Sequence, residues 1–342
     1  VLGIGMFAGG IVLPYLGLKY LGHGQVAEGL RILLYSRQAH LNSIGGPRDA
    51  VPFSTLFTGM LLVNLYYWGT EQYIVQQALA SRNLAESQKG MAAAALGKII
   101  SPLLLNIPGL IAVHLYTHLP NTAEVFPQIV SDVCPPVLTG YMAAITFGAA
   151  LTTFNAGLNS TSTLFILNLY KPLKAWRQQP VSERQLVRAG KRFEILVCLL
   201  AMFIAPFIAF ARQGLYTYLQ MVSGFFSVPI FTILLVGLVH RRVPAIAAKI
   251  GLTFFILTYA ASQLLVDTGL HFLHVLAILF VLTVALMLMI GALYPMPVPF
   301  EQKWNNVVDL QPWKHRHYYA ALLLLAMVAV FVLFSPWGLA RR

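Results

Sequence analysis

The chain has 342 residues, of which 58% are hydrophobic and 10% are charged, whereas about a quarter of the residues of an ordinary soluble domain are charged. So few charges cannot cover the surface of a water-soluble protein of this length, and so apolar a composition excludes a disordered chain. Only two cysteines are present, Cys134 and Cys198, which excludes a disulfide scaffold. We therefore expect an all-α polytopic membrane protein.

The predicted membrane-spanning helices follow from the apolar runs, because about 20 mostly apolar residues are needed to cross about 30 Å of hydrocarbon. Nine runs meet that length: 1–22, 53–75, 91–117, 137–168, 193–211, 215–239, 245–266, 272–294 and 318–338. The first run lacks the basic start and the cleavage pattern of a signal peptide. Since the chain opens on Val1 inside this run, we expect that helices preceding it are missing.

The net charge of +12 is gathered in the connections between the apolar runs. Segment 169–192 carries seven lysines and arginines, whereas segment 118–136 carries none. Because cytoplasmic loops of membrane proteins are enriched in Lys and Arg, segment 169–192 is expected inside and the C-terminus outside. The charge thus predicts topology and not a nucleic-acid partner. In the long outer segment 23–52, the amphipathic stretch 27–38 predicts a short helix on the membrane surface.

Lys98 is the most informative single residue. It lies eight residues into the run that opens near Met91, which corresponds to a depth of about 12 Å in a helix. A lysine stem reaches only about 6 Å, and a charge at that depth costs a few kcal/mol or more. Either the helix begins one turn later and Lys98 is interfacial, or Lys98 faces a polar cavity as a hydrogen-bond donor or ion-pair partner. The depth favours the cavity.

A polar and aromatic face is predicted in the second run. Asn64, Tyr67, Glu71 and Gln72 follow each other at helical spacing and would share one side of a helix. With Trp68 beside them, they indicate either an aromatic belt at the inner interface or a face that binds solute and closes a gate. The belt does not account for Asn64, which should lie deeper in the membrane.

Two further features allow both a structural and a functional interpretation. Small and hydroxylated residues form a stripe in the fourth run: Ala149, Thr152, Thr153, Ala156, Ser160 and Thr163. Such a stripe is typical of close helix packing, but adjacent threonine hydroxyls also supply the hard oxygens that Na⁺ prefers. Gln220, inside an apolar run, needs hydrogen-bond partners from neighbouring helices or from a ligand.

Signatures of catalysis are missing from the sequence. There is no P-loop, dinucleotide-binding fingerprint or nucleophile elbow. His114 and His118 are four residues apart, but no acidic third ligand accompanies them. We therefore expect neither an enzyme nor a metal site other than one for sodium.

Three segments, in this order, carry a resemblance to a known family: NLYYWGTEQYIVQQ (64–77), Lys98 in a Gly-Lys-x-x-x-Pro context, and LNSTSTLFILNLYKP (158–172). Together they resemble the sodium/solute symporter family, above all its bacterial sodium–galactose and related sugar symporters. The resemblance implies the five-plus-five inverted-repeat, LeuT-like transporter fold. By position, 1–22 matches the last helix of the first repeat, 53–239 the second repeat and 245–342 additional helices, with most of the first repeat missing.

The resemblance also implies roles for single residues. The sodium site would be formed by Ala149, Thr152 and Thr153, and the solute site by Asn64, Lys98 and Gln220. The gates would be Tyr67 with Trp68 on the cytoplasmic side and Tyr216 on the outer side. Glu71 stands where the family commonly has Asp or Asn, which leaves its role open.

The predicted function is sodium-coupled symport of a small polar solute, a sugar being favoured, by alternating access in the bacterial inner membrane. A related symporter for an amino acid, organic acid or vitamin is the main alternative, because Lys98 would also suit a carboxylate. A transporter-like solute sensor and a proton-translocating subunit are weaker alternatives. The expected partners are Na⁺, the solute and membrane lipid; the sequence leaves a homo-oligomer open.

Overall fold

The computed structural model of the protein describes residues 2–47, 49, 51–116, 124–210, 215–266, 268–301 and 308–340. Every regular element in these ranges is a helix. The chain divides into two compact units. The first unit comprises Val1–Ser43, Gln88–Phe210 and Trp313–Arg342, and the second comprises Ile44–Ser87 and Ala211–Pro312.

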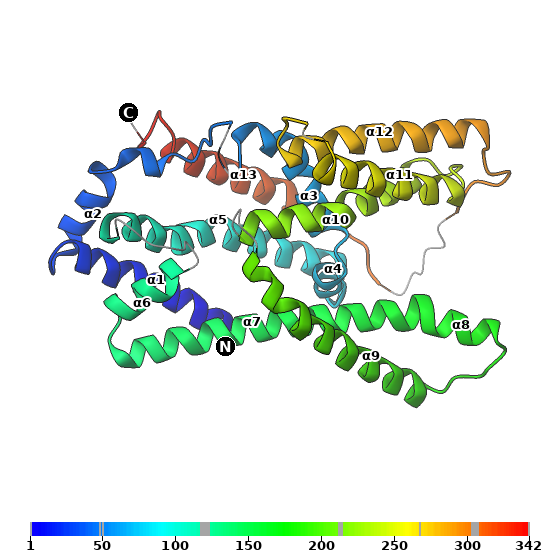
Figure 1. Cartoon of the computed structure of the whole chain (residues 1–342), viewed down its shortest axis with the longest axis horizontal. Coiled ribbons are helices and arrows are strands. Elements are labelled where there is room, and N and C mark those ends of the chain that lie inside the picture. Colours follow the sequence, from blue (N-terminus) through cyan, green and yellow to red (C-terminus); the bar gives the residue numbers. More distant parts are fainter. Residues whose placement is uncertain are drawn as a thin grey trace. The chain divides into compact units, whose positions relative to one another are not determined.

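The first unit is built on long helices joined by short surface elements. Its helices are α1 (Leu2–Leu21), α2 (Val26–Tyr35), η1 (Gln38–Leu41), most of α5 (Leu84–Leu115), α6 (Val125–Val133), α7 (Pro136–Phe165), η4 (Ile166–Tyr170), α8 (Lys171–Trp176), α9 (Glu183–Ile204), η5 (Ala205–Phe210) and α13 (Arg316–Leu333). The π-helical turn η4 joins α7 to α8 in one continuous rod, and α9 returns alongside it (Figure 1).

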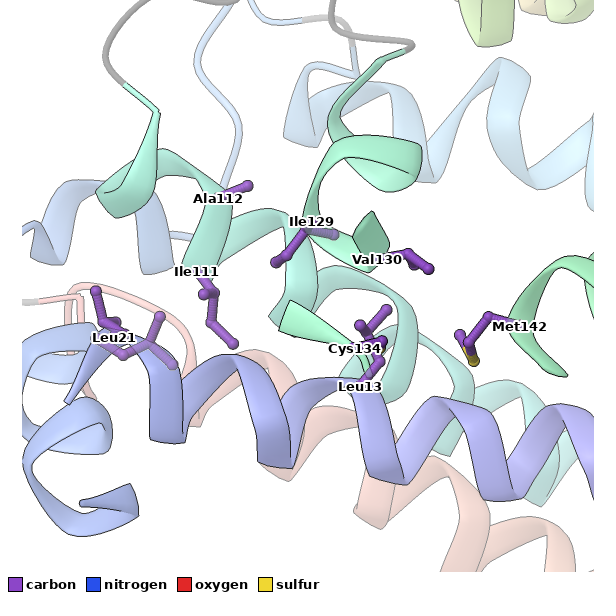
Figure 2. Packing of buried hydrophobic residues seen from close by; sticks show 9 residues of the cluster. Leu13, Leu21, Ile111, Ala112, Ile129, Val130, Cys134 and Met142 are labelled. Atoms are coloured by element: carbon purple, nitrogen blue, oxygen red, sulfur yellow. The ribbon is translucent and has the colours of Figure 1, made fainter. Parts of the chain in front are cut away.

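Glycines on α1 allow close packing in the core of the first unit. A β carbon at Gly17 would lie 2.9 Å from Ile111 of α5, and one at Gly9 would lie 2.6 Å from Ile145 of α7. Figure 2 shows Ile111 pointing toward α1 between Leu13 and Leu21. Small residues at helix contacts are the usual means of packing helices in membranes, where no hydrophobic force drives helices together.

The second unit is a helical bundle around an aromatic core. It contains η2 (Phe53–Phe57), α3 (Gly59–Gly69), α4 (Gln72–Leu79), α10 (Leu215–Val239), α11 (Ala245–Leu264) and α12 (Phe272–Leu293). Phe255 and Tyr259 of α11 are fully buried against α10 and α12. The Tyr259 hydroxyl donates to the Met221 carbonyl at 3.2 Å, so the polar group of this buried ring is satisfied.

Seven helices of the described chain are long and apolar enough to span a membrane. They confirm seven of the nine predicted runs. Run 53–75 is wrong as a single helix, because α3 ends at Gly69 and α4 begins at Gln72. Run 193–211 covers the apolar end of α9 and the 3₁₀-helix η5. Because the first half of α9 is charged, α9 has no apolar stretch long enough to span a membrane as a single helix.

The surfaces of the spanning helices are apolar. No residue of α13 is buried, although it is rich in Leu, Val and Ala, and Leu264 of α11 is 80% exposed. Apolar side chains exposed along several long helices indicate a lipid environment, and the chain is an integral membrane protein. The predicted amphipathic helix is confirmed as α2. Residues 117–123, which include His118 of the predicted histidine pair, lie outside the described part of the chain.

Candidate functional site

The nine residues predicted to form the transport site are shared between the two units. Lys98, Ala149, Thr152 and Thr153 belong to the first unit. Asn64, Tyr67, Trp68, Tyr216 and Gln220 belong to the second unit. Each group has its own local geometry.

The predicted sodium ligands lie on one turn of α7. The Thr152 hydroxyl donates to the Ala149 carbonyl at 3.0 Å, so two of the three residues predicted for the sodium site are in contact. Thr153 is exposed, and its hydroxyl makes no hydrogen bond within the described residues. Threonines inside helices usually bond to a carbonyl three or four residues earlier. Thr153 therefore keeps its hydroxyl oxygen available as a ligand.

Farther along α7, one stripe residue, Ser160, and the neighbouring Ser162 lie where the helix packs. Ser160 and Ser162 are buried, and a β carbon at Gly190 of α9 would lie 2.9 Å from the Ser162 hydroxyl. Beside this contact, Phe165 of α7 stacks on Phe193 of α9 with 4.0 Å between ring centroids. Both interpretations of the stripe are thus compatible with the structure, each for a different part of α7: packing near Ser162, and exposed hydroxyls near Thr153.

Lys98 occupies the middle of α5, which begins at Leu84, seven residues before the apolar run. Pro102 lies four residues later and has no N–H to donate to the Lys98 carbonyl. The Ser101 hydroxyl contacts that carbonyl instead, at 3.3 Å. The Lys98 side chain is exposed on the first unit and makes no salt bridge within the described residues. Position 98 therefore combines a free ammonium group with a weakly bonded carbonyl.

The polar face predicted for residues 64–72 is interrupted. Thr70 ends α3, where its N–H and hydroxyl both donate to the Tyr66 carbonyl at 2.8 Å. The Glu71 N–H donates to the same carbonyl at 3.0 Å. Because the helix stops here, Glu71 and Gln72 do not continue the helical face of Asn64 and Tyr67. Threonine side chains compete in this way for backbone groups at helix ends.

The break brings Tyr73 to Tyr67. The Tyr73 hydroxyl donates to the Tyr67 hydroxyl at 2.8 Å, and the two rings meet edge to face with 5.9 Å between centroids. Trp68 meets Tyr67 in the same manner at 5.4 Å. All three side chains are at least partly buried. Tyr67, the predicted inner gate, is thus held between aromatic partners on both sides of the break.

Asn64 and Gln220 are brought together through Met60 of α3. The Asn64 amide donates to the Met60 carbonyl at 2.9 Å, and the Gln220 amide contacts the Met60 sulfur at 4.0 Å. Gln220 also donates to the Tyr216 hydroxyl at 3.4 Å. These bonds are long or local, so both amides retain hydrogen-bonding capacity for a polar ligand.

Tyr73 and Met60 were not predicted from the sequence. In an unbroken helix, Tyr73 would lie about 240° around the axis from Tyr67, because each residue turns about 100°. The signal that could have revealed their contact is the Gly69–Thr70 pair, since glycine and threonine favour helix ends. Met60 belongs to the apolar surface of α3 and gave no sequence signal.

The helices and their polar residues define a polytopic membrane protein in which some helices are interrupted. Comparisons with known proteins agree with this class. The model of the sodium:solute symporter family matches residues 6–254. The uncharacterized symporter YidK of Escherichia coli K12 is 40% identical over 336 residues, which cover 98% of this chain and 58% of that protein. The chain belongs to the sodium:solute symporter family.

Other relatives carry names that state a solute. The sodium/glucose cotransporter of Vibrio parahaemolyticus is 27% identical over 71% of this chain and 48% of its own length. The human sodium/myo-inositol cotransporter 2 is 25% identical over 67% of this chain and 38% of its own length. The chain thus spans about half the length, or less, of these named cotransporters.

Proposed function

We propose that this chain forms part of a sodium-coupled symporter for a small neutral polyol, a sugar being favoured, that works by alternating access in the bacterial inner membrane. Family membership supports the transport class. The single observation that carries the sodium coupling is the pair of exposed threonines on α7, with the Thr152 hydroxyl on the Ala149 carbonyl.

The oxygen atoms at this turn suit Na⁺. Two hydroxyls and one main-chain carbonyl are neutral, hard donors, and such donors beside interrupted helices coordinate Na⁺ in transporters of this kind. The Thr152 hydroxyl donates its proton to Ala149 and therefore keeps lone pairs for a cation. We infer that Thr153 contributes a second hydroxyl and that the remaining ligands come from other helices of the full-length protein.

The solute-binding groups are two amides and one ammonium. Asn64 and Gln220 both donate and accept hydrogen bonds, which suits sugar hydroxyls, and Lys98 adds a donor. The names of the relatives, sodium/glucose and sodium/myo-inositol cotransporters, support a polyol. Sodium bound at α7 would favour the outward-open state, and the solute would leave past Tyr67 to the cytoplasm, with Tyr216 as the outer gate. We further infer that the C-terminus lies outside.

The experiment is uptake into proteoliposomes that contain the full-length product of the gene encoding this chain. Labelled glucose, galactose and myo-inositol are offered with and without an inward sodium gradient. We expect gradient-driven uptake of at least one of them. Thr153→Ala should raise the sodium concentration for half-activation about tenfold or more, which corresponds to about 1.4 kcal/mol.

The matched control is Thr161→Ala, on the same helix. The Thr161 hydroxyl already donates to the Gly157 carbonyl at 2.8 Å, so its removal should leave sodium activation unchanged. Sodium-independent uptake of every solute, or equal sodium activation in wild type and Thr153→Ala, would overturn the proposal. If a labelled carboxylate offered in a parallel assay is taken up with the sodium gradient and none of the three polyols is, the alternative substrate class is selected, with Lys98 as its counter-ion.

A further inference from the structure

A basic pocket lies near the turn of the α8–α9 hairpin, within the first unit. Two of its lining residues, Ala189 and Arg192, flank Gly190, which packs on Ser162. Its volume is about 410 Å³, which is within the usual range of small-ligand sites. Lys174 lines it from α8, and Arg188 and Arg192 line it from α9. No acidic residue is part of the lining.

The sequence folds into this pocket through the turn after α8. Gln178 adopts a left-handed conformation with φ of 54°, and the Gln179 N–H donates to the Lys174 carbonyl at 3.0 Å. This is the Schellman arrangement that ends helices, usually with glycine at the left-handed position. Ser182 then begins α9 with a complete capping box. The hairpin is therefore a defined structure at both ends of its turn.

Lys174 is held in place by two partners, and none of the three cations of the pocket is neutralised by a salt bridge within the described residues. The Lys174 ammonium donates to the Gln179 side chain at 2.7 Å and lies 5.8 Å from the centre of the Tyr170 ring. Arg188 and Arg192 are one helical turn apart on α9, and neither makes a salt bridge within the described residues. Three positive charges around one cavity repel each other unless an anion joins them.

The surroundings of the pocket are those of a membrane interface. Trp176 at the end of α8 is 80% exposed, and Leu169 in the preceding π-helical turn is 59% exposed. Tryptophan and basic residues next to exposed apolar side chains are typical of the headgroup level of a bilayer. The α7–α8 rod has 41 residues, about 60 Å at 1.5 Å per residue, so it extends well beyond a hydrocarbon core of about 30 Å.

We propose that this pocket binds a phosphate group, with the phosphodiester headgroup of an anionic phospholipid as its source. Two guanidinium groups and one ammonium group match a phosphate in charge and in hydrogen-bond donors. The exposed apolar side chains beside the pocket offer a path for the acyl chains. Because the headgroup lies at the membrane surface, lipid bound in the pocket would hold the α8–α9 hairpin there. None of the proposed sodium and solute residues lines the pocket.

The test is a thermal-stability assay of the purified full-length protein in neutral detergent. The three probes are phosphatidylglycerol, phosphatidylcholine and inorganic phosphate. We expect phosphatidylglycerol to raise the Tm and phosphatidylcholine to leave it unchanged. In the variant R188Q/R192Q, the apparent affinity for phosphatidylglycerol should fall about tenfold or more, because each lost guanidinium removes charge-assisted hydrogen bonds.

The matched control is K171Q/R184Q. It removes the same charge from the same hairpin, but neither residue lines the pocket. Equal losses in the two double variants would show general attraction to the basic segment and overturn the proposal, as would the absence of any shift with all three probes. A shift with inorganic phosphate that only R188Q/R192Q loses, without one for phosphatidylglycerol, would assign the pocket to free phosphate.

Discussion

The backbone of Gly59 lies directly against that of Leu273, so that a β carbon at position 59 would overlap the Leu273 carbonyl group, 2.6 Å from its carbon atom. This contact joins the start of α3 to α12 in the second unit. Beside it, the His274 ring lies between two hydroxyls, with Ser54 at 3.1 Å and Thr58 at 3.0 Å. The start of the helix that carries Asn64 and Tyr67 is thus fixed to α12 by both contact and hydrogen bonds.

We predict that Gly59→Ala destabilises the protein by about 2–3 kcal/mol, because a backbone group cannot rotate away from the new methyl as a side chain could. Gly69→Ala is the control at the other end of α3, where nothing lies within 4 Å of the added carbon. It should be neutral or slightly stabilising, since alanine favours helices. Thermal unfolding in detergent measures both; equal Tm values for the two variants would show that the close contact is not maintained.

Arg37 caps the end of α5. Its guanidinium donates to the Val113 carbonyl at 2.6 Å, in the last turn of the helix, where carbonyls have no partner within the helix. We predict that Arg37→Ala lowers the free energy of unfolding by about 1–2 kcal/mol, through loss of a charge-assisted bond and of a favourable charge near the helix C-terminus.

Arg31→Ala is the control for this prediction. Arg31 is 74% exposed and pairs with Glu28 at 3.6 Å within α2, an arrangement that contributes about 0.5 kcal/mol or less. Chemical or thermal unfolding should therefore show a clearly larger effect for Arg37. A loss at Arg31 as large as that at Arg37 would mean that the cap contributes nothing beyond a surface charge.

Asp132 on α6 is held in its charged form. The Tyr116 hydroxyl donates to the carboxylate at 2.6 Å, and the Gln128 amide lies 3.0 Å from each carboxylate oxygen. These bonds lower the pKa of Asp132, the Tyr116 bond most of all. A lowered folded-state pKa adds stability at pH values above the unfolded pKa of about 3.9, and this stability is lost as the pH falls through the folded value.

We predict that Tyr116→Phe raises the pKa of Asp132 toward its usual value and removes the larger part of this acid-dependent stability, while the Gln128 bonds remain. The effect on stability should be small, because the carboxylate is almost fully exposed. The chain has four aspartates, so carboxyl-labelled aspartate gives few NMR signals to titrate. Tyr15→Phe, which removes an exposed hydroxyl, should leave the Asp132 titration unchanged; an unshifted titration in Tyr116→Phe would refute the role of that bond.

Much of the fold was predictable because hydrophobic length alone predicts a spanning helix. The seven confirmed spans are long apolar runs, and α2 was evident from its amphipathic pattern. The break at Thr70 was not predicted, although Thr70, Glu71 and Gln72 are polar. Apolar residues on both sides make 53–75 long enough for one span, and hydropathy does not register a side chain that bonds to a carbonyl. Likewise, hydropathy assigns the charged first half of α9 to a connection between spans, whereas it is helical from Glu183 onward.

The candidate site was predictable residue by residue but not in its contacts. The Thr152 bond to Ala149 follows from helical spacing, and the isolation of Thr153 does not, because only the structure shows which hydroxyl is bonded. That the Lys98 carbonyl lacks its usual helical hydrogen bond could have been inferred from Pro102, four residues later, because proline has no N–H to donate. From sequence, the basic segment indicates topology only. The pocket lined by Lys174 and Arg188 depends on a left-handed turn at Gln178, and glutamine, unlike glycine, does not signal such a turn.

The last prediction concerns the contact of Tyr67 with Tyr73, and it rests on the proposed gate. If Tyr67 closes the solute site on the cytoplasmic side, Tyr73→Phe should loosen it by removing the hydroxyl that donates to Tyr67. We expect about a fivefold rise in the KM for solute uptake, which corresponds to about 1 kcal/mol for one hydrogen bond. Tyr218→Phe, which removes a hydroxyl from the exposed side of α10, should leave the KM unchanged.

A double-mutant cycle separates the hydrogen bond from the two hydroxyls taken singly. Tyr67→Phe should raise the KM about as much as Tyr73→Phe, and the double variant should raise it no further, because either change alone already removes the bond. The sodium concentration for half-activation should stay constant throughout, since neither ring contributes to the proposed sodium ligands on α7. Additive effects in the double variant would show that the two hydroxyls act independently and that Tyr73 does not position the gate.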